Sequence, residues 1–196
     1  MKNIELLSEI ALTFIRLDSF DKQMNSVLGI IGKHMDVSRV YVFLDNESGI
    51  STSNVYEWCN SGIEPQIDEL QDIPYDIIPS WKKILEKEGR IYSENINALP
   101  SDLVEILAQQ EIISLIVYPL VIEHKLQGFI GFDECRQNRR WSDIELEILK
   151  TTSGIISSSM ERNFLQEKLI QSETNFRNFF DTIDDFFIIG SMSGDV

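Results

Sequence analysis

The densest group of ionisable side chains follows a glycine-punctuated apolar run in the stretch GFIGFDECRQNRRWSDIELEIL, residues 128–149. Asp133 and Glu134 end the run, and a cluster of arginines follows, at Arg136, Arg139 and Arg140. Because the free N–H groups at the start of a helix attract negative charge, cations gathered there could form an anion site. More often such a loop is solvated, and its cations oppose the acid excess of the chain.

The residues that come next in this stretch favour a structural interpretation. Ser142 and Glu145 have the S-x-x-E spacing of a capping box, in which each side chain accepts the free backbone N–H of the other residue. Trp141 and Leu146 stand where a hydrophobic staple would hold the entering chain. We therefore interpret this stretch first as the start of a helix and only second as a ligand site.

Residues that usually act as nucleophiles, general bases or metal ligands are scarce. The two cysteines, Cys59 and Cys135, are far apart and form no C-x-x-C pair, so they predict neither a disulfide framework nor a zinc site. The two histidines are His34 and His124, and a single histidine in a helix or hairpin is usually structural or solvated. We expect no metal site and no catalytic residue.

The charge balance argues against two further classes of function. The chain has 32 acidic and 17 basic residues, a formal net charge of −15. A nucleic-acid-binding protein needs cations that face phosphates, and an anionic membrane surface repels so acidic a chain. Apolar runs such as ISLIVYPLVI are too short to span a membrane, and the amphipathic segment MKNIELLSEIALTFIRL is unlike a signal peptide. The composition predicts an acidic, cytoplasmic, non-catalytic globular module.

Hydrophobic periodicity predicts the order of the elements that position these residues. Two amphipathic helices come first, and the alternation then changes to that of strands. The predicted elements are helices at 4–17 and 24–35, a hairpin of strands 38–45 and 50–59, a loop at 60–75, a helix at 79–89 capped by Gly89, a strand at 90–95, a helix at 101–110, a second hairpin at 112–123 and 126–134, and a long helix from 143 to about 171. Pro119 predicts a bulge or bend in the second hairpin.

This order of elements resembles a GAF domain. The resemblance rests on the stretches VSRVYVFLDN, GRIYSENINALP, ISLIVYPLVIEHKLQGFIGFDE and RRWSDIELEILKTTSGIISSSMERN. It implies an α+β fold related to profilin and PAS folds, in which terminal helices pack on one face of an antiparallel sheet while short helices and loops cover a pocket on the other. It also implies a parent chain, a multidomain bacterial or archaeal sensor histidine kinase.

The C-terminal stretch SETNFRNFFDTIDDFFIIGSMSG is similar to the first helix and strand of a PAS domain. The predicted organisation is a GAF domain at 1–162, a helical signalling linker at 163–172 and the N-terminal part of a PAS domain at 173–196. The segment FFIIG is the strand candidate of that last part.

The ligand motifs of known GAF domains match this sequence poorly. Domains that bind cyclic nucleotides carry an Asn-Lys pair after the last strand and a following F-x-x-x-D-E, and here Asp133-Glu134 stands in place of the pair. Phe129 has the F-x-x-x-D-E spacing to these acids, but along a strand, where alternation puts Phe129 and Asp133 on one face and Glu134 on the other. The resemblance therefore argues against a cyclic nucleotide.

The other cofactors of the family lack their attachment residues. Bilin-binding domains use a cysteine commonly followed by His, together with a D-I-P stretch. Asp72-Ile73-Pro74 has those letters, but Asn60 and Arg136 follow the cysteines, so we interpret D-I-P as an ordinary loop turn. The sulfoxide-reducing members need a cluster of cysteines, and haem needs an axial ligand that only the two histidines or the thiols could supply. The ligand stays unknown.

What remains is a possible pocket lined by aromatic residues. Strand alternation puts Tyr41 and Phe43 on one face of the first strand and its aliphatic residues on the other. The candidate ligand-binding residues are Tyr41, Phe43, Trp58, Trp81, Tyr92 and Tyr118. Such residues more often simply fill a core. Two hypotheses therefore stay open: a module that binds a small, largely apolar or aromatic ligand, and a ligand-free dimerisation and relay element.

The long helix carries two overlapping heptad registers, and the resemblance to kinase input domains implies a parallel homodimer through this helix and the N-terminal pair. The alternative is that the helix only covers the sheet and that the segment past Arg162 is a passive spacer. One register runs from Ile144 through Ile148 and Leu165 to Phe176, and the other, one residue on, includes Leu149. Two competing registers suit a relay, since a small rotation exchanges one packing for the other.

Overall fold

The computed structural model describes residues 2–16 and 19–192, with side chains described at 4–16 and 19–180. The chain forms two compact units, residues 1–159 and 160–196. Among the described residues, no helix is both long enough and apolar enough to cross a membrane.

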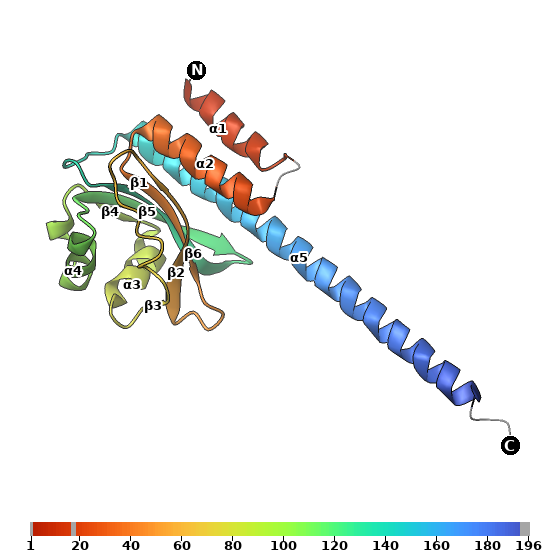
Figure 1. Ribbon diagram of the computed structural model, residues 1–196. Helices are drawn as coiled ribbons and strands as arrows, with labels where there is room; N and C mark the ends of the chain where they lie inside the picture. Colours follow the sequence, from red (N-terminus) through yellow and green to blue (C-terminus); the bar gives the residue numbers. More distant parts are fainter. Residues whose placement is uncertain (1, 17–18, 193–196) are drawn as a thin grey trace. The chain divides into compact units, whose positions relative to one another are not determined.

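A six-stranded antiparallel sheet is the centre of the first unit, with the strand order β3-β2-β1-β6-β5-β4 (Figure 1). The strands are β1 (Arg39–Asp45), β2 (Ser51–Cys59), β3 (Ile73–Pro74), β4 (Ile91–Ser93), β5 (Ser114–Ile122) and β6 (Lys125–Glu134). Both predicted hairpins are confirmed. The β1 and β6 strands form the middle of the sheet, although they are far apart in the sequence, because β1 pairs with both β2 and β6.

The terminal helices lie along one face of this sheet (Figure 1). They are α1 (Lys2–Thr13), α2 (Phe20–Met35) and the first part of α5 (Asp143–Met192). Trp58 of β2 packs against α2 so closely that a Cβ at Gly32 would lie 2.1 Å from its ring. The Tyr118 hydroxyl of β5 donates to the backbone carbonyl of Leu146 in α5, at 3.0 Å.

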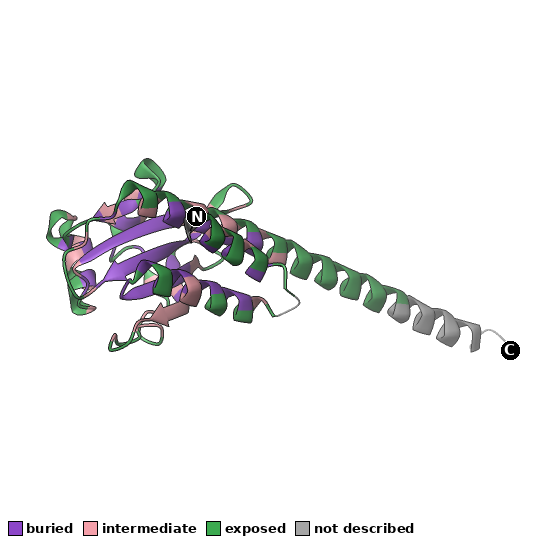
Figure 2. Ribbon diagram, turned by 90° about the horizontal axis from the view of Figure 1, so that it is seen from above, coloured by how far each residue is buried: buried purple, intermediate pink, exposed green. Residues whose placement is uncertain are grey.

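Short helices and a long loop cover the opposite face. They are α3 (Pro79–Glu88), the 3-10 turn η1 (Ile96–Ala98) and α4 (Ser101–Gln109). Gly89 caps α3 in the left-handed conformation, at φ 70°, with its N–H on the Leu85 carbonyl, as predicted. Figure 2 shows that burial concentrates in the strands and on the helix faces turned toward them. Each face of the sheet therefore has its own core.

The irregularity predicted at Pro119 lies one residue further on. Pro119 stays paired with Phe129, and the register of β5 against β6 shifts between Leu120 and Val121. The long predicted loop after β2 also contains the short edge strand β3, so Ile73-Pro74 is not only a turn.

The capping box predicted at the start of α5 is confirmed. The Ser142 hydroxyl accepts from the Glu145 N–H at 3.3 Å, and the Glu145 carboxylate accepts from the Ser142 N–H at 2.7 Å. Trp141, just before the cap, is buried.

The strand predicted at FFIIG is not formed. These residues continue α5, which runs to Met192, and residues 193–196 of the predicted PAS segment lie outside the described part. An isolated strand leaves its backbone groups unpaired, whereas a helix satisfies them within itself. No described strand pairs with this segment, so the helix is the form that fits its surroundings.

Candidate functional site

Three side chains of β1 define the floor of the candidate site. Arg39, Tyr41 and Phe43 point to the face covered by α3 and α4, because alternate residues of a strand share a face. Their direct partners on β6 are Asp133, Gly131 and Phe129. Three cross-strand pairs therefore follow one another along the two central strands. The first, Arg39 with Asp133, is polar, the second places the Tyr41 ring over a glycine, and the third, Phe43 with Phe129, is a pair of rings.

The ring of Tyr41 occupies the space that a side chain at residue 131 would need. A Cβ on Gly131 would lie 2.1 Å from the tyrosine ring, far inside contact distance. Because glycine has no Cβ, the ring can lie flat on the strand, and its hydroxyl reaches Asp133 at 2.9 Å. The glycine thus positions the tyrosine.

Aromatic rings form one wall. Phe43 stacks on Phe129 with centroids 4.8 Å apart, and Tyr41 meets Phe43 edge-on at 5.5 Å. Trp81 reaches Phe129 from α3 at 5.1 Å. Stacked and edge-on pairs at these distances are the favoured arrangements of aromatic side chains.

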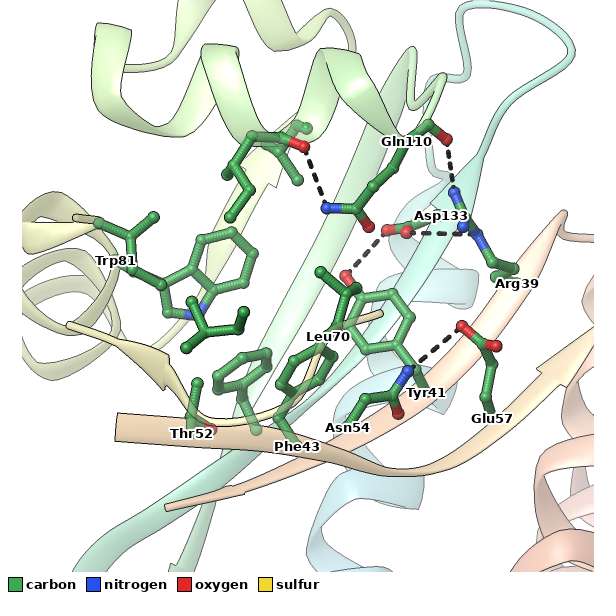
Figure 3. Close-up of a pocket in the computed structure, with 15 residues that line it drawn as sticks. Arg39, Tyr41, Phe43, Thr52, Asn54, Glu57, Leu70, Trp81, Gln110 and Asp133 are labelled. Atoms are coloured by element: carbon green, nitrogen blue, oxygen red, sulfur yellow. Dashed lines mark hydrogen bonds and ion pairs between the residues drawn. The ribbon is translucent and has the colours of Figure 1, made fainter. Parts of the chain in front are cut away.

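A cavity of about 40 Å³ lies among these rings (Figure 3). Its lining comes from the sheet, the loop after β2, α3 and α4, and comprises Arg39, Tyr41, Phe43, Thr52, Asn54, Glu57, Leu70, Ile73, Ile78, Trp81, Ile106, Leu107, Gln110, Phe129 and Asp133. The space has room for a few water molecules and is far below the several hundred Å³ usual for drug-sized ligands.

A buried ion pair closes one end of this cavity. Arg39 is 2% exposed and Asp133 1%, with 4.0 Å between Arg39 Nε and Asp133 Oδ2. The guanidinium also donates to the Gln110 carbonyl at 2.7 Å and to Cys135 Sγ at 3.4 Å. A charge removed from water needs such partners to remain ionised.

Burial changes the protonation of this end of the cavity. It raises the pKa of Asp133 to about 7, although the Arg39 charge and the Tyr41 hydroxyl both favour the ionised carboxylate. Burial, together with the adjacent Asp133, raises the pKa of Tyr41 well above its usual value. The hydroxyl therefore stays protonated and donates a hydrogen bond to Asp133. Near neutral pH the carboxyl exchanges between its charged and neutral forms.

Several buried polar atoms of the lining lack a hydrogen-bond partner. Among the described side chains they are Arg39 Nε, Asn54 Oδ1, Trp81 Nε1 and Asp133 Oδ2. Two are donors and two are acceptors, and all four residues are at least nine-tenths buried. Buried polar groups normally have partners, so these four atoms, gathered on one cavity, are available to a water or a ligand there.

A second cavity, of about 240 Å³, adjoins the first. Arg39 and Gln110 line both, and the second is otherwise formed by Gly62, Ile63, Glu64, Gln66, Gln109, Glu111 and Cys135. Its lining is mostly polar, whereas the first is mostly apolar. The Arg39 side chain therefore lies between an aromatic interior and a polar outer space.

The residue after Asp133 leads to the other face of the sheet. Glu134 is fully buried and accepts from Ser38 at 2.9 Å and from the Arg136 side chain at 2.8 Å. Arg139 lies 3.6 Å from the same carboxylate and donates to Glu145 of α5 at 2.7 Å.

The same arginine also holds the end of α2. Arg139 donates to the carbonyls of Met35 and Asp36, at 2.7 and 2.9 Å. We call Glu134, Arg136 and Arg139 the arginine clamp. It joins β6, the C-terminus of α2 and the first turn of α5, so the arginines predicted as a possible anion site contact protein carboxylates and carbonyls instead.

The structure brings together half of the predicted aromatic residues. Tyr41, Phe43 and Trp81 line the cavity, as alternation predicted for the first two. Trp58, in contrast, packs on α2 on the other face of the sheet. It follows Glu57, which faces the cavity, and successive residues of a strand face opposite sides.

The other two tyrosines also lie elsewhere. Tyr118 points to α5. Tyr92 lies near Arg90 and donates to Glu94 at the short edge strand β4.

Sequence reasoning missed the polar half of the site. The strand alternation that puts Tyr41 on the cavity face puts Arg39 on the same face. Alternation also placed Phe129 and Asp133 on one face, but they were not assigned to the pocket. No local sequence pattern indicates Asn54, Glu57 or Gln110. The pairing of β2 with β1 and the turn after α4 bring these residues to the cavity.

The residues considered for cofactors and metals are dispersed. Cys59 and Cys135 are free, half-buried thiols, and Cys135 borders the outer cavity. Of the D-I-P letters, Ile73 lines the inner cavity. No group of three His, Cys, Asp or Glu side chains within the described ranges could hold a metal ion.

The chain is similar to known proteins in sequence. Residues 20–160 match the family model for the GAF domain. A curated relative, the "Methanogenesis regulatory histidine kinase FilI" of Methanothrix harundinacea (strain 6Ac), is 31% identical over 157 residues, which cover 78% of this chain and 18% of the relative. The chain thus spans less than a fifth of that protein.

Solved structures share the fold. The phycocyanobilin-bound GAF domain of a cyanobacterial phytochrome matches with a TM-score of 0.73 at 16% identity, over 85% of this chain and 97% of that one. A domain of a putative two-component sensor histidine kinase from Sinorhizobium meliloti 1021 matches with a TM-score of 0.61 at 18% identity, over 77% and 97%. At these identities the likeness concerns architecture.

Proposed function

The chain belongs to the GAF domain family, and from that premise we propose that it is a non-catalytic sensory module of a multidomain histidine kinase. In this proposal the module binds a small ligand and relays the signal through α5. The likeness to a regulatory histidine kinase supports the choice of parent protein. The proposed boundaries are a GAF domain at 1–162, a helical linker at 163–172 and the start of a PAS domain at 173–196.

The observation that carries ligand binding is the cavity on the β1–β6 strands. It combines four aromatic rings with four unpartnered buried polar atoms, and a ligand could pair those atoms. Fold likeness alone would not assign a ligand site.

The arginine clamp supports the relay. Asp133 borders the cavity and Glu134, its neighbour, belongs to the clamp, so the two successive residues face opposite sides of the sheet. A shift of β6 on ligand binding would reach the α2 carbonyls and Glu145 through Arg139. The α5 helix begins at this point and continues to Met192.

Exposed apolar side chains support a parallel homodimer through the terminal helices. On α1 they include Ile4 and Leu12, and beyond residue 160 on α5 they include Phe164, Leu165, Leu169, Ile170 and Phe176. The competing heptad positions Leu149 and Ile156 are buried in the first unit, which leaves the distal positions for a partner.

A ligand-free dimerisation and relay element is the second candidate. The small size of the inner cavity, about 40 Å³, favours it, since the space has room for water but not for an aromatic ring unless its wall moves. In that case the rings are core, and only the helices carry function.

Native mass spectrometry and an absorbance spectrum of the freshly purified chain separate these candidates. A retained ligand would appear as a mass excess that is lost on denaturation, and a bilin or haem would add visible absorbance. A cavity-filling variant, Leu70→Phe, should lose that excess, while Val55→Phe, at an exposed site of the same sheet, should keep it. No excess, together with no thermal stabilisation by any small molecule tried, would favour the ligand-free element.

Sedimentation of the whole chain, compared with a version that ends at Arg162, tests the dimer. We expect the whole chain to dimerise and the shorter chain to dimerise more weakly. If both chains are monomers at high micromolar concentration, the homodimer is contradicted. If both dimerise equally, the helix beyond Arg162 makes no contribution to the dimer.

A further inference from the structure

We propose that the cavity selects an uncharged molecule with a planar apolar body and one edge that carries both a hydrogen-bond donor and an acceptor, as in an aromatic carboxamide or lactam. Arg39 and Asp133 would bind that edge. This inference rests on the proposed function and names the class of ligand that the site would take.

The body of the ligand follows from the walls. Phe43 and Phe129 present a stacked pair, and Tyr41 and Trp81 stand at its sides. Flat rings leave a flat space, and a planar ligand gains stacking or edge-on contacts there that a branched aliphatic one does not. Figure 3 shows Phe43 and Trp81 on the side of the cavity away from Arg39 and Asp133, with Tyr41 between them and its hydroxyl on Asp133.

The polar edge follows from the atoms that lack partners. Arg39 Nε offers an N–H and Asp133 Oδ2 a lone pair, and 4.0 Å separates them, too far for a hydrogen bond to each other. An amide group presents a C=O and an N–H side by side, so it can accept from the first and donate to the second. One ligand group would then satisfy two buried atoms that the protein leaves unpaired.

The absence of net charge on the ligand follows from the pair itself. Above about pH 7, the value to which burial raises the pKa of Asp133, its carboxylate neutralises Arg39. Glu57, the other lining carboxylate, accepts from Asn54 and from the Gln66 and Ile67 N–H groups. An entering anion would compete with Asp133 for Arg39, and a cation would compete with Arg39 for Asp133. Either one would bring an uncompensated charge into an apolar space.

Entry of a ring requires the outer wall to move. Leu70 and Ile106 are partly buried, and Leu70 belongs to the loop after β2 rather than to a strand. Leu70→Ala would enlarge the cavity without touching the polar pair.

Four single-ring probes of matched size test the proposal: benzamide, benzoate, benzylamine and toluene. Binding to the whole chain and to Leu70→Ala is measured by calorimetry or ligand-observed magnetic resonance. We expect benzamide to bind at least tenfold more tightly than the two ions and more tightly than toluene. Equal binding of all four, or preference for an ion, would overturn the ligand class while the proposed binding function stands.

Substitution of the pair gives a second readout. Asp133→Asn keeps the shape but leaves the Arg39 charge without its counterion, so the preference should move from benzamide to benzoate. The matched control Trp58→Phe lies on the other face of the sheet and should keep the wild-type order. An unchanged order in Asp133→Asn would refute the role of the pair. If no probe binds either chain and no mass excess is retained, the cavity holds water only and the proposed ligand-binding function fails as well.

Discussion

The Asp133 carboxyl should make the stability of the first unit depend on pH in an unusual direction. Burial raises its pKa to about 7 in the folded chain, whereas in the unfolded chain the ordinary value near 4 applies. Between these values the folded state holds a proton that the unfolded state has released. The stability contribution is therefore fully present below the unfolded pKa and is lost as the pH rises through the folded pKa.

The magnitude follows from the two pKa values. Each unit of pKa difference corresponds to about 1.4 kcal/mol, so the contribution should fall by roughly 2–3 kcal/mol between about pH 5 and about pH 8. Asp133→Asn removes it. The variant also leaves Arg39 without its counterion, but arginine stays charged over this range, so that cost is a constant offset.

Urea denaturation of both chains across this range is the assay. The unfolding free energy of the variant minus that of the wild type should increase by roughly 2–3 kcal/mol from about pH 5 to about pH 8, since the titrations of groups that do not interact with Asp133 cancel in the difference. Glu47→Gln, in the exposed β1–β2 turn, is the control and should show a flat difference. A flat difference for Asp133→Asn would mean that the carboxyl is ionised throughout, and the account of its burial would be wrong.

Three further substitutions test the positioning of the site. Gly131→Ala forces the Tyr41 ring off the strand and should lower the free energy of unfolding by about 1–3 kcal/mol in urea denaturation. The control is Gly154→Ala in α5, where a Cβ meets nothing within 4 Å, and it should be neutral or stabilising. Equal effects of the two substitutions would contradict the close approach of Tyr41 to Gly131. Ser142→Ala should cost about 1 kcal/mol by loss of the cap, and no loss would contradict the capping box. Arg139→Met should lower the free energy of unfolding by about 1–3 kcal/mol, since it removes contacts to α2, β6 and α5 together. Amide hydrogen exchange should become faster at the start of α5. Unchanged exchange there would show that the arginine clamp does not stabilise this helix.

The order of elements and the cavity floor could be predicted from the sequence because both depend on local periodicity. Alternation along β1 fixed which face Tyr41 and Phe43 share, and the S-x-x-E spacing located the start of α5. Trp58 could not be placed in this way, since the register of β2 shifts by a bulge between Val42 and Phe43 of its partner strand. Asn54 and Gln110 reach the cavity through long-range packing, which no local pattern records.

The Arg39–Asp133 pair is hard to explain as a device for stability. Replacing a buried ion pair by apolar side chains is often neutral or stabilising, and here the rings beside it already form an apolar core. The pair also leaves two atoms unpaired, which adds to its cost. Its place in the sheet suits the proposed relay, because Glu134, the next residue of β6, belongs to the arginine clamp. A ligand that satisfied Asp133 would act on a strand whose next residue, Glu134, contacts the first turn of α5 through Arg139.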